Sequence, residues 1–164
     1  YVERAANQGH EVSQFNTGVK YRDGLGCEQS DERAAEGFQK AALQGHAVAQ
    51  NELGCAYEFG EGVPQSNEKA FELYQQSAAQ GHSNGQNNLG FFYYSGRGCK
   101  QSYERAAQLF RQSAAQGNMT AQCNLAVSQI RSMSCTSAGT TTPKNHSNRL
   151  GLFRKRARRS PELP

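Results

Sequence analysis

Residues 47–82 read AVAQNELGCAYEFGEGVPQSNEKAFELYQQSAAQGH, and the same pattern recurs without a gap on both sides of this stretch. The preceding block begins at Glu11 and the following block begins at Ser83, so the period is 36 residues. A fixed period of this length predicts a repeat protein, in which each block is one structural unit that stacks on the next.

Each block predicts two helices, here called helix A and helix B, because small and aromatic residues fall at helical spacing in both of its halves. In the central block, helix A carries Ala49, Leu53 and Tyr57 on one face. Helix B carries an apolar stripe that starts at Ala70 and continues at i+4, i+7 and i+8. The turn between the two helices is Gly60-Glu61-Gly62, whose glycines allow the chain to reverse direction.

The ends of helix B are marked by residues that recur in every complete block. A serine precedes the helix and can cap its free backbone amides, and a glycine follows the last apolar residue, as expected for a left-handed cap. The serines are Ser30, Ser66 and Ser102, and the glycines are Gly45, Gly81 and Gly117.

With these positions the chain resembles the Sel-one-like repeat family, a relative of the tetratricopeptide repeat. Its pattern A-x-A-x-x-x-L-G-x-x-Y, G-x-G, K-A-x-x-x-Y-x-x-A-A-x-x-G is met at Ala47, Ala49, Leu53, Gly54, Tyr57, Gly60, Gly62, Lys69, Ala70, Tyr74, Ala78 and Gly81. The resemblance implies an all-α fold, a right-handed α-solenoid of antiparallel helix pairs. It also implies a role as an adaptor, an assembly platform or a regulatory subunit. The serine cap departs from the family's usual acidic residue and should leave the fold unchanged.

The resemblance divides the chain into repeats and a tail. The repeats cover 1–133, with a partial block 1–10, complete blocks 11–46, 47–82 and 83–118, and a partial block 119–133. Because the chain begins inside a block, we expect further repeats before it. The last block loses the pattern after Leu125, since Ala126 replaces the glycine and Gln129 replaces the tyrosine. A polar C-terminal cap, a splice variant and a change of reading frame all fit this ending.

Residues 134–164 form a Ser/Thr-rich and basic tail that we expect to be disordered. The tail carries a net charge of +6 and the chain +4, so the repeats carry −2, and nucleic acid could be a partner only through the tail. The basic run 154–159 fits a nuclear import signal or a contact with a polyanion. It equally fits a solvated tail with no specific partner.

The composition favours a cytoplasmic protein, with the nucleus as the alternative. The chain lacks the roughly 20 consecutive apolar residues that a transmembrane helix needs, so no membrane association is predicted. The five cysteines form no repeated pair, which favours a reducing compartment over a disulfide framework. The oligomeric state has no signature in the sequence.

Catalytic and metal sites are not predicted, and neither is a cofactor. His10, His46 and His82 recur at one repeat position, but successive turns of a solenoid lie too far apart to share a metal ion, so a structural role is favoured. Ser66 and Lys69 match the S-x-x-K motif of serine β-lactamases, an activity proposed for some relatives, yet S-D-N and K-T-G are absent. We therefore interpret Ser66 as a helix cap.

The candidate binding residues are the outward positions of helix A, which line the concave face of tetratricopeptide-like solenoids. They are Phe15, Asn16, Val19, Lys20, Asn51, Glu52, Cys55, Asn87, Asn88, Phe91, Phe92, Asn124 and Val127. The asparagines could bind the backbone of an extended peptide, and the phenylalanines could anchor it. Alternatively, the asparagines join neighbouring repeats, and Phe91 or Phe92 is covered by a neighbouring helix.

The sequence thus favours a scaffold or adaptor that binds peptides or partner domains on the concave face of the repeats. The first alternative is a nuclear factor that is targeted or tethered by its basic tail. The second alternative, ranked last, is a β-lactamase-like hydrolase.

Overall fold

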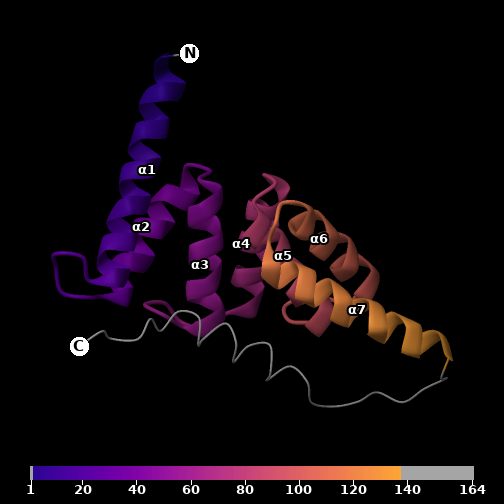
Figure 1. The fold of residues 1–164 in the computed structure, drawn as a ribbon. Coiled ribbons are helices and arrows are strands. Elements are labelled where there is room, and N and C mark those ends of the chain that lie inside the picture. The colour runs from indigo at the N-terminus through magenta and orange to yellow at the C-terminus, as the bar shows by residue number, and fades with distance from the viewer. Residues whose placement is uncertain (1, 138–164) are drawn as a thin grey trace, which may run out of the picture. The chain divides into compact units, whose positions relative to one another are not determined.

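The computed structural model of the chain describes residues 2–137, and it describes side chains for residues 10–128. Within residues 2–137 the backbone forms seven α-helices and no strand, so the predicted all-α fold class is confirmed (Figure 1). Most of the predicted disordered tail, from residue 138 onward, lies outside the described residues.

The helices follow one another as helix A and helix B of successive repeats. They are α1 (Val2–Asp23), α2 (Asp31–Leu43), α3 (Ala47–Phe59), α4 (Asn67–Ala79), α5 (Ser83–Ser95), α6 (Tyr103–Ala115) and α7 (Met119–Ser137). The helices α1, α3 and α5 each pack against the helix B that follows, and α2 and α4 pack in turn against α3 and α5. This order of contacts is that of an α-solenoid of helical hairpins.

The core between the first two repeats is made of small and aromatic side chains from α2 and α3. The buried members are Ala34, Phe38, Ala41, Ala42, Ala49, Leu53 and Ala56. Burying apolar area drives the stacking, so each repeat depends on its neighbour for most of its stability.

A glycine on each of the helices α1, α3 and α5 admits an aromatic ring of the helix B that follows. A Cβ atom on Gly54 would lie 2.8 Å from Cε1 of Tyr74, and one on Gly90 would lie 2.8 Å from Cε1 of Phe110. Contacts this short do not occur between real side chains, so the residue at this repeat position must be glycine for the ring to be seated. The cost that glycine imposes on a helix is therefore offset by packing.

The predicted caps of helix B are confirmed. The hydroxyl oxygens of Ser30, Ser66 and Ser102 each accept a hydrogen bond, 3.3 Å long, from the backbone N–H three residues later. Gly81 ends α4 with a φ of 80°, a left-handed conformation that favours glycine.

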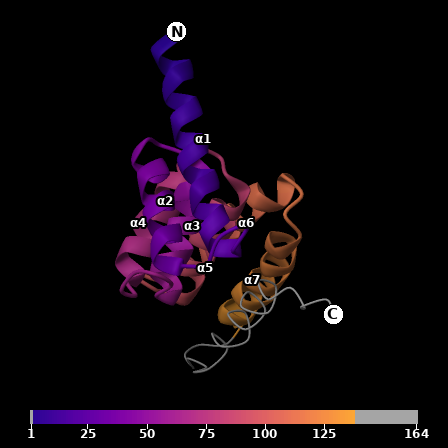
Figure 2. The same cartoon turned by 90° about the vertical axis from the view of Figure 1, so that its left-hand side faces the viewer.

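The structure differs from the prediction at the first partial block. Residues 1–10 match the end of a helix B, but α1 continues through Gly9 and His10 without a turn, and its first half projects beyond α2 (Figures 1 and 2). In complete blocks the turn is held by a glutamine that reaches back to the preceding helix A, as Gln44 does to Gln14 at 2.6 Å. A glycine inside a helix costs only about 1 kcal/mol relative to alanine, so Gly9 does not force the backbone to turn at this point.

The last helix also runs further than predicted. The boundary between repeats and tail was placed at residue 133, whereas α7 ends at Ser137. Glycine and proline are absent from Met119 to Ser137, so no strong helix breaker interrupts this stretch.

Candidate binding surface

Seven of the predicted binding residues are buried, which corrects the expectation that they face outward. They are Asn51, Cys55, Asn87, Asn88, Phe91, Phe92 and Asn124. The physical reason is that the helices A of successive repeats lie close enough to form hydrogen bonds with one another. The predicted binding residues therefore lie in an interface between repeats. A partner cannot reach these side chains while the repeats are stacked.

The buried asparagines join the repeats, as in the alternative interpretation of the sequence. Asn88 of α5 donates to the side-chain oxygen of Asn51 of α3 at 2.8 Å. Asn124 of α7 donates in the same way to Asn87 of α5 at 2.9 Å. Because a buried amide without a partner costs free energy, these bonds fix the register of one helix A on the next.

The two phenylalanines of α5 are covered from different sides. Phe92 is 0% exposed, and its ring meets the ring of Tyr74 edge to face with centroids 5.2 Å apart. Phe91 is 6% exposed, and the guanidinium of Arg97 lies 5.4 Å from its ring centre. Neither ring is an anchor for an incoming peptide in this arrangement.

A buried carboxylate, which sequence reasoning missed, lies at the same interface. Glu58 of α3 is 3% exposed and accepts a hydrogen bond of 2.7 Å from the hydroxyl of Tyr74. Arg97, from the turn after α5, forms an ion pair with it at 3.4 Å. The sequence carried no signal for this carboxylate, because its repeat position holds a different residue in each complete block, namely Arg22, Glu58 and Tyr94.

The remaining predicted residues do reach the surface, most of them on α1. Asn16 and Lys20 are exposed, whereas Phe15 and Val19 are half-buried and pack against the first core. The ring of Phe15 lies 5.7 Å from that of Phe38, centre to centre.

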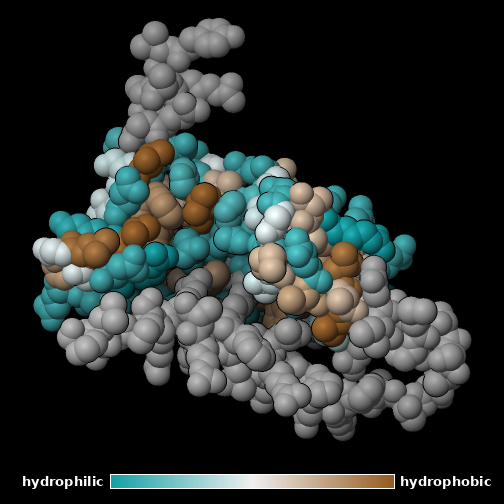
Figure 3. Space-filling view, in the orientation of Figure 1, coloured by the Kyte–Doolittle hydropathy of each residue, from teal (hydrophilic) through white to brown (hydrophobic). Residues whose placement is uncertain are grey.

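The other two are Glu52 and Val127. Glu52 of α3 is half-buried and forms an ion pair with Arg22 of α1 at 2.8 Å. Val127 of α7 is 42% exposed. Figure 3 shows hydrophobic side chains gathered over α1 and around α7, with a mostly hydrophilic surface between them.

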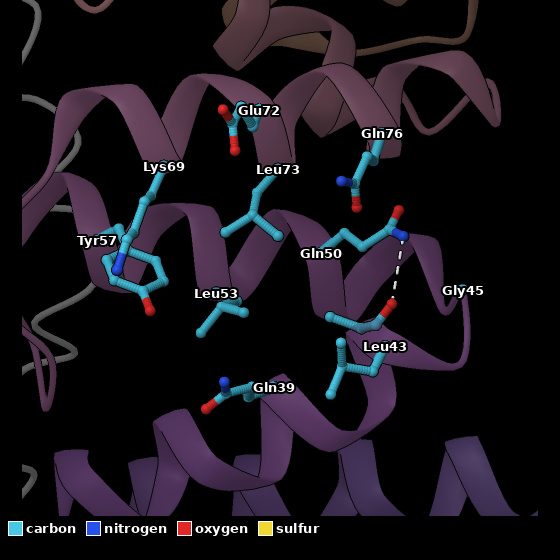
Figure 4. Close-up of a pocket in the computed structure, with 11 residues that line it drawn as sticks. Gln39, Leu43, Gly45, Gln50, Leu53, Tyr57, Lys69, Glu72, Leu73 and Gln76 are labelled. Carbon is cyan, nitrogen blue, oxygen red and sulfur yellow. Dashed lines mark hydrogen bonds between the residues drawn. The ribbon is translucent and has the colours of Figure 1, made fainter.

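The helix B side holds a groove that the sequence analysis did not identify. It has a volume of about 440 Å³ and is lined by α2 and α4, with α3 running between these two helices (Figure 4). The lining residues are Gln39, Ala42, Leu43, Gly45, Gln50, Leu53, Tyr57, Lys69, Glu72, Leu73 and Gln76. The floor residues had been assigned to the core by their helical spacing, and spacing alone does not show where adjacent helices B leave a gap.

Two of the three recurring histidines, His46 and His82, cap a helix A. Nδ1 of His46 accepts from the backbone N–H of Ala49 at 3.1 Å, and Nδ1 of His82 accepts from that of Gly85 at 3.3 Å. Burial lowers the pKa of His82, and the nearby Glu52 opposes this effect. Among the described residues no group of His, Cys, Asp and Glu side chains could hold a metal ion.

Ser66 acts as a helix cap. Its hydroxyl donates to Glu68 at 3.0 Å and accepts from the backbone N–H of Lys69. The ammonium of Lys69 lies over the ring of Tyr57, 5.0 Å from its centre. This arrangement does not resemble a serine nucleophile with a lysine base, which requires the two side chains to be hydrogen-bonded.

The described part of the chain shows two further features that bear on its environment. Cys27, Cys55, Cys99 and Cys123 are free thiols. No helix within residues 2–137 is both long and apolar enough to cross a bilayer.

The stacked hairpins, with amide ladders between successive helices A, define the protein as an α-solenoid repeat protein. The family model of the Sel1 repeat matches residues 12–46, 47–82 and 83–118. The chain therefore belongs to the Sel1 repeat family, as the resemblance predicted.

Solved structures support the same assignment. A Sel1 repeat protein from Oxalobacter formigenes is 32% identical, with a TM-score of 0.69, and the match covers 73% of this chain and 49% of that protein. The protein c5321, a protective antigen of uropathogenic Escherichia coli with an SLR fold, is also 32% identical with a TM-score of 0.69. That match covers 84% of this chain and 28% of the antigen, so the chain spans half or less of both relatives.

A more distant similarity concerns the fold alone. The cysteine-rich protein B of Helicobacter pylori is 23% identical with a TM-score of 0.52, over 55% of this chain and 68% of that protein. Among curated proteins none matches the chain significantly.

Proposed function

We propose that this chain is a protein-binding scaffold that docks peptides or partner domains on the exposed residues of its helices A. The observation that supports the proposal is the contrast between two sets of positions. On the helices A, the recurring Gln50 and Gln86 lie inside the stack and bond to its other helices. The position of the exposed Lys20 varies instead, with Ala56 and Phe92 one and two repeats later, as it does where each repeat contributes a different contact.

The proposed surface is smaller than the sequence suggested. It comprises Asn16 and Lys20 on α1, Glu52 on α3 and Val127 on α7, with the half-buried Phe15 and Val19 at its edge. The Arg22–Glu52 ion pair places opposite charges side by side between α1 and α3. A surface of this mixed polar character suits a transient partner better than a permanent one, because obligate interfaces are more apolar.

The test is cross-linking of the chain, followed by identification of the captured proteins. The variant Asn16→Ala with Lys20→Glu changes two exposed side chains, so its helical content should equal that of the wild type. We expect the variant to lose the captured partner. The matched control is Lys40→Glu, which reverses an exposed charge on the helix B side. Equal capture by all three proteins would show that this surface is not the binding site.

We propose the cytoplasm as the compartment of this adaptor, and the basic tail motivates a second candidate, a nuclear factor. Seven basic residues against one acidic residue between 134 and 164 are the observation behind it. Deleting residues 154–159 and imaging the full chain would test this candidate. Nuclear enrichment that disappears on deletion is the expected result, and an unchanged distribution would rule it out.

A further inference from the structure

The groove between α2 and α4 has an apolar floor that is open to solvent. Leu53 of α3 and Leu73 of α4 lie in it, and the ring of Tyr57 closes one end together with Lys69 (Figure 4). Its volume of about 440 Å³ lies within the range of sites that accept a small molecule or a few side chains. The size thus allows one or two residues of a peptide to enter.

Leu43 is the feature of this groove that the fold does not require. It is the last residue of α2 and is 81% exposed, although it is a large apolar side chain. The equivalent residues one and two repeats later are Ala79 and Ala115. Since alanine serves at the same position in two other helices B, a leucine here extends the apolar surface of the groove without a structural need.

The rims of the groove carry uncommitted amide groups. Gln39 on α2 and Gln76 on α4 are exposed and form no hydrogen bond with another described residue. A glutamine side chain has both a donor and an acceptor, so it can bond to the N–H and C=O of an extended backbone. Gln50, by contrast, is already bonded to Gln80 at 2.7 Å and belongs to the stack.

The charges on the groove are arranged along its length. Lys69 is the only basic lining residue and lies at the Tyr57 end, while Leu43 and Gly45 lie at the opposite end (Figure 4). Glu72 is the only acidic one and stands one turn after Lys69 on the same helix. An acidic side chain is favoured beside Lys69, and the apolar side chain of a ligand is favoured towards Leu43.

We propose that this groove is a second docking site, which takes an extended peptide segment with an aliphatic side chain next to an acidic residue. The aliphatic side chain packs on Leu43, Leu53 and Leu73, and the carboxylate pairs with Lys69. Gln39 and Gln76 bond to the peptide backbone from the two rims. The inference rests on the proposed function in that the chain binds proteins, but the rims of this groove are formed by the helices B α2 and α4.

The probe is a phage-displayed library of random peptides, selected on the whole chain, from which the enriched peptides are synthesised and titrated by fluorescence anisotropy. Leu43→Glu and Lys69→Glu alter exposed side chains and should leave the fold intact, which circular dichroism checks. The matched control is Ala79→Glu, the same change at the exposed equivalent position one repeat later.

The expected result is that enriched peptides share an aliphatic residue next to Asp or Glu. Leu43→Glu and Lys69→Glu should each weaken their binding about tenfold or more, and Ala79→Glu should leave it unchanged. Equal affinity of the peptides for the wild type and all three variants would overturn the inference. If the variant Asn16→Ala with Lys20→Glu then abolishes their binding, the proposed helix A surface stands. A selection without enrichment would also overturn the inference, while the cross-linking experiment would still decide the proposed function.

Discussion

At the scale of the residue, the same repeat position serves different purposes in different blocks. Asn16 is exposed, Glu52 is half-buried in an ion pair, and Asn88 is buried and bonded to Asn51. All three stand at one position of the 36-residue period. The environment of a side chain therefore depends on which helix covers it, which the residue type alone does not reveal.

Phe92 illustrates the energetic side of this point. It is 0% exposed against Tyr74, so Phe92→Ala removes a buried ring and leaves a cavity. We expect the free energy of unfolding to fall by about 3–5 kcal/mol, measured by urea denaturation. Val127→Ala, at a residue 42% exposed, is the control and should cost far less. Equal midpoints for Phe92→Ala and the wild type would contradict the buried position of this ring.

His82 gives the repeat stack a dependence on pH. Because burial holds its folded-state pKa below the unfolded value of about 6.5, the unfolded chain binds this proton more readily. The stabilisation from the neutral cap is thus present above that unfolded value and is lost as the pH falls through the folded-state pKa. Protonation of Nδ1 also removes the acceptor for the N–H of Gly85.

The variant His82→Asn tests this dependence with a residue that the protein already uses. Asn118 occupies the same repeat position and caps α7 by accepting from the N–H of Ala121 at 3.0 Å. We expect His82→Asn to keep most of the cap and to lose less stability than the wild type when the pH is lowered from about 7.5 to about 5. Parallel curves of unfolding free energy against pH for the two proteins would show that His82 is not the responsible group.

At the scale of the element, the helices A are held to one another and to helix B by amide ladders. Gln80 and Gln116 each donate to the glutamine of the preceding helix A, at 2.7 and 2.8 Å. The asparagine bonds run between successive helices A. Bonds of both kinds are buried or partly buried, where an unpaired amide costs free energy. Neighbouring repeats therefore pack against each other in one register only.

A double-mutant cycle on Asn51 and Asn88 measures one of these bonds. Each single change to alanine leaves one buried amide without its partner and should cost about 1–3 kcal/mol of unfolding free energy. The double variant should cost less than the sum, with a coupling of about 0.5 kcal/mol or more. Asn16→Ala, exposed at the repeat position of Asn88, should change stability by no more than about 0.5 kcal/mol. Additive single effects would mean that the two amides do not interact.

The elements also show what the sequence can and cannot predict. Within the three complete blocks the period placed the helices, the serine caps and the glycine turns correctly, because these depend on local spacing and backbone conformation. It did not show that Asn88 and Phe92 are buried, since that depends on how closely one helix A approaches the next. Glu58 and the groove at Leu43 were missed for the same reason, as each is formed by side chains from two or three helices.

At the scale of the whole molecule, a stack of repeats has no single core, and each repeat contacts only its neighbours. Within the described residues, α3 packs against α2, α4 and α5, whereas the first half of α1 projects beyond α2 (Figures 1 and 2). The free energy needed to open a helix should therefore be highest in the central repeats and lowest in the N-terminal half of α1.

Amide hydrogen exchange read by mass spectrometry tests this gradient along the chain. We expect peptides from Ala47–Phe59 and Ser83–Ser95 to exchange slowest, because these helices A are covered on several sides and carry the asparagine bonds. Peptides from the first half of α1 should exchange fastest among the described helices, since this half projects beyond α2 (Figure 1). The same peptides in a urea-unfolded sample supply the intrinsic rates as the control. Equal protection in all helices would show that the chain opens as one cooperative unit, and the nearest-neighbour description of its stability would then be wrong.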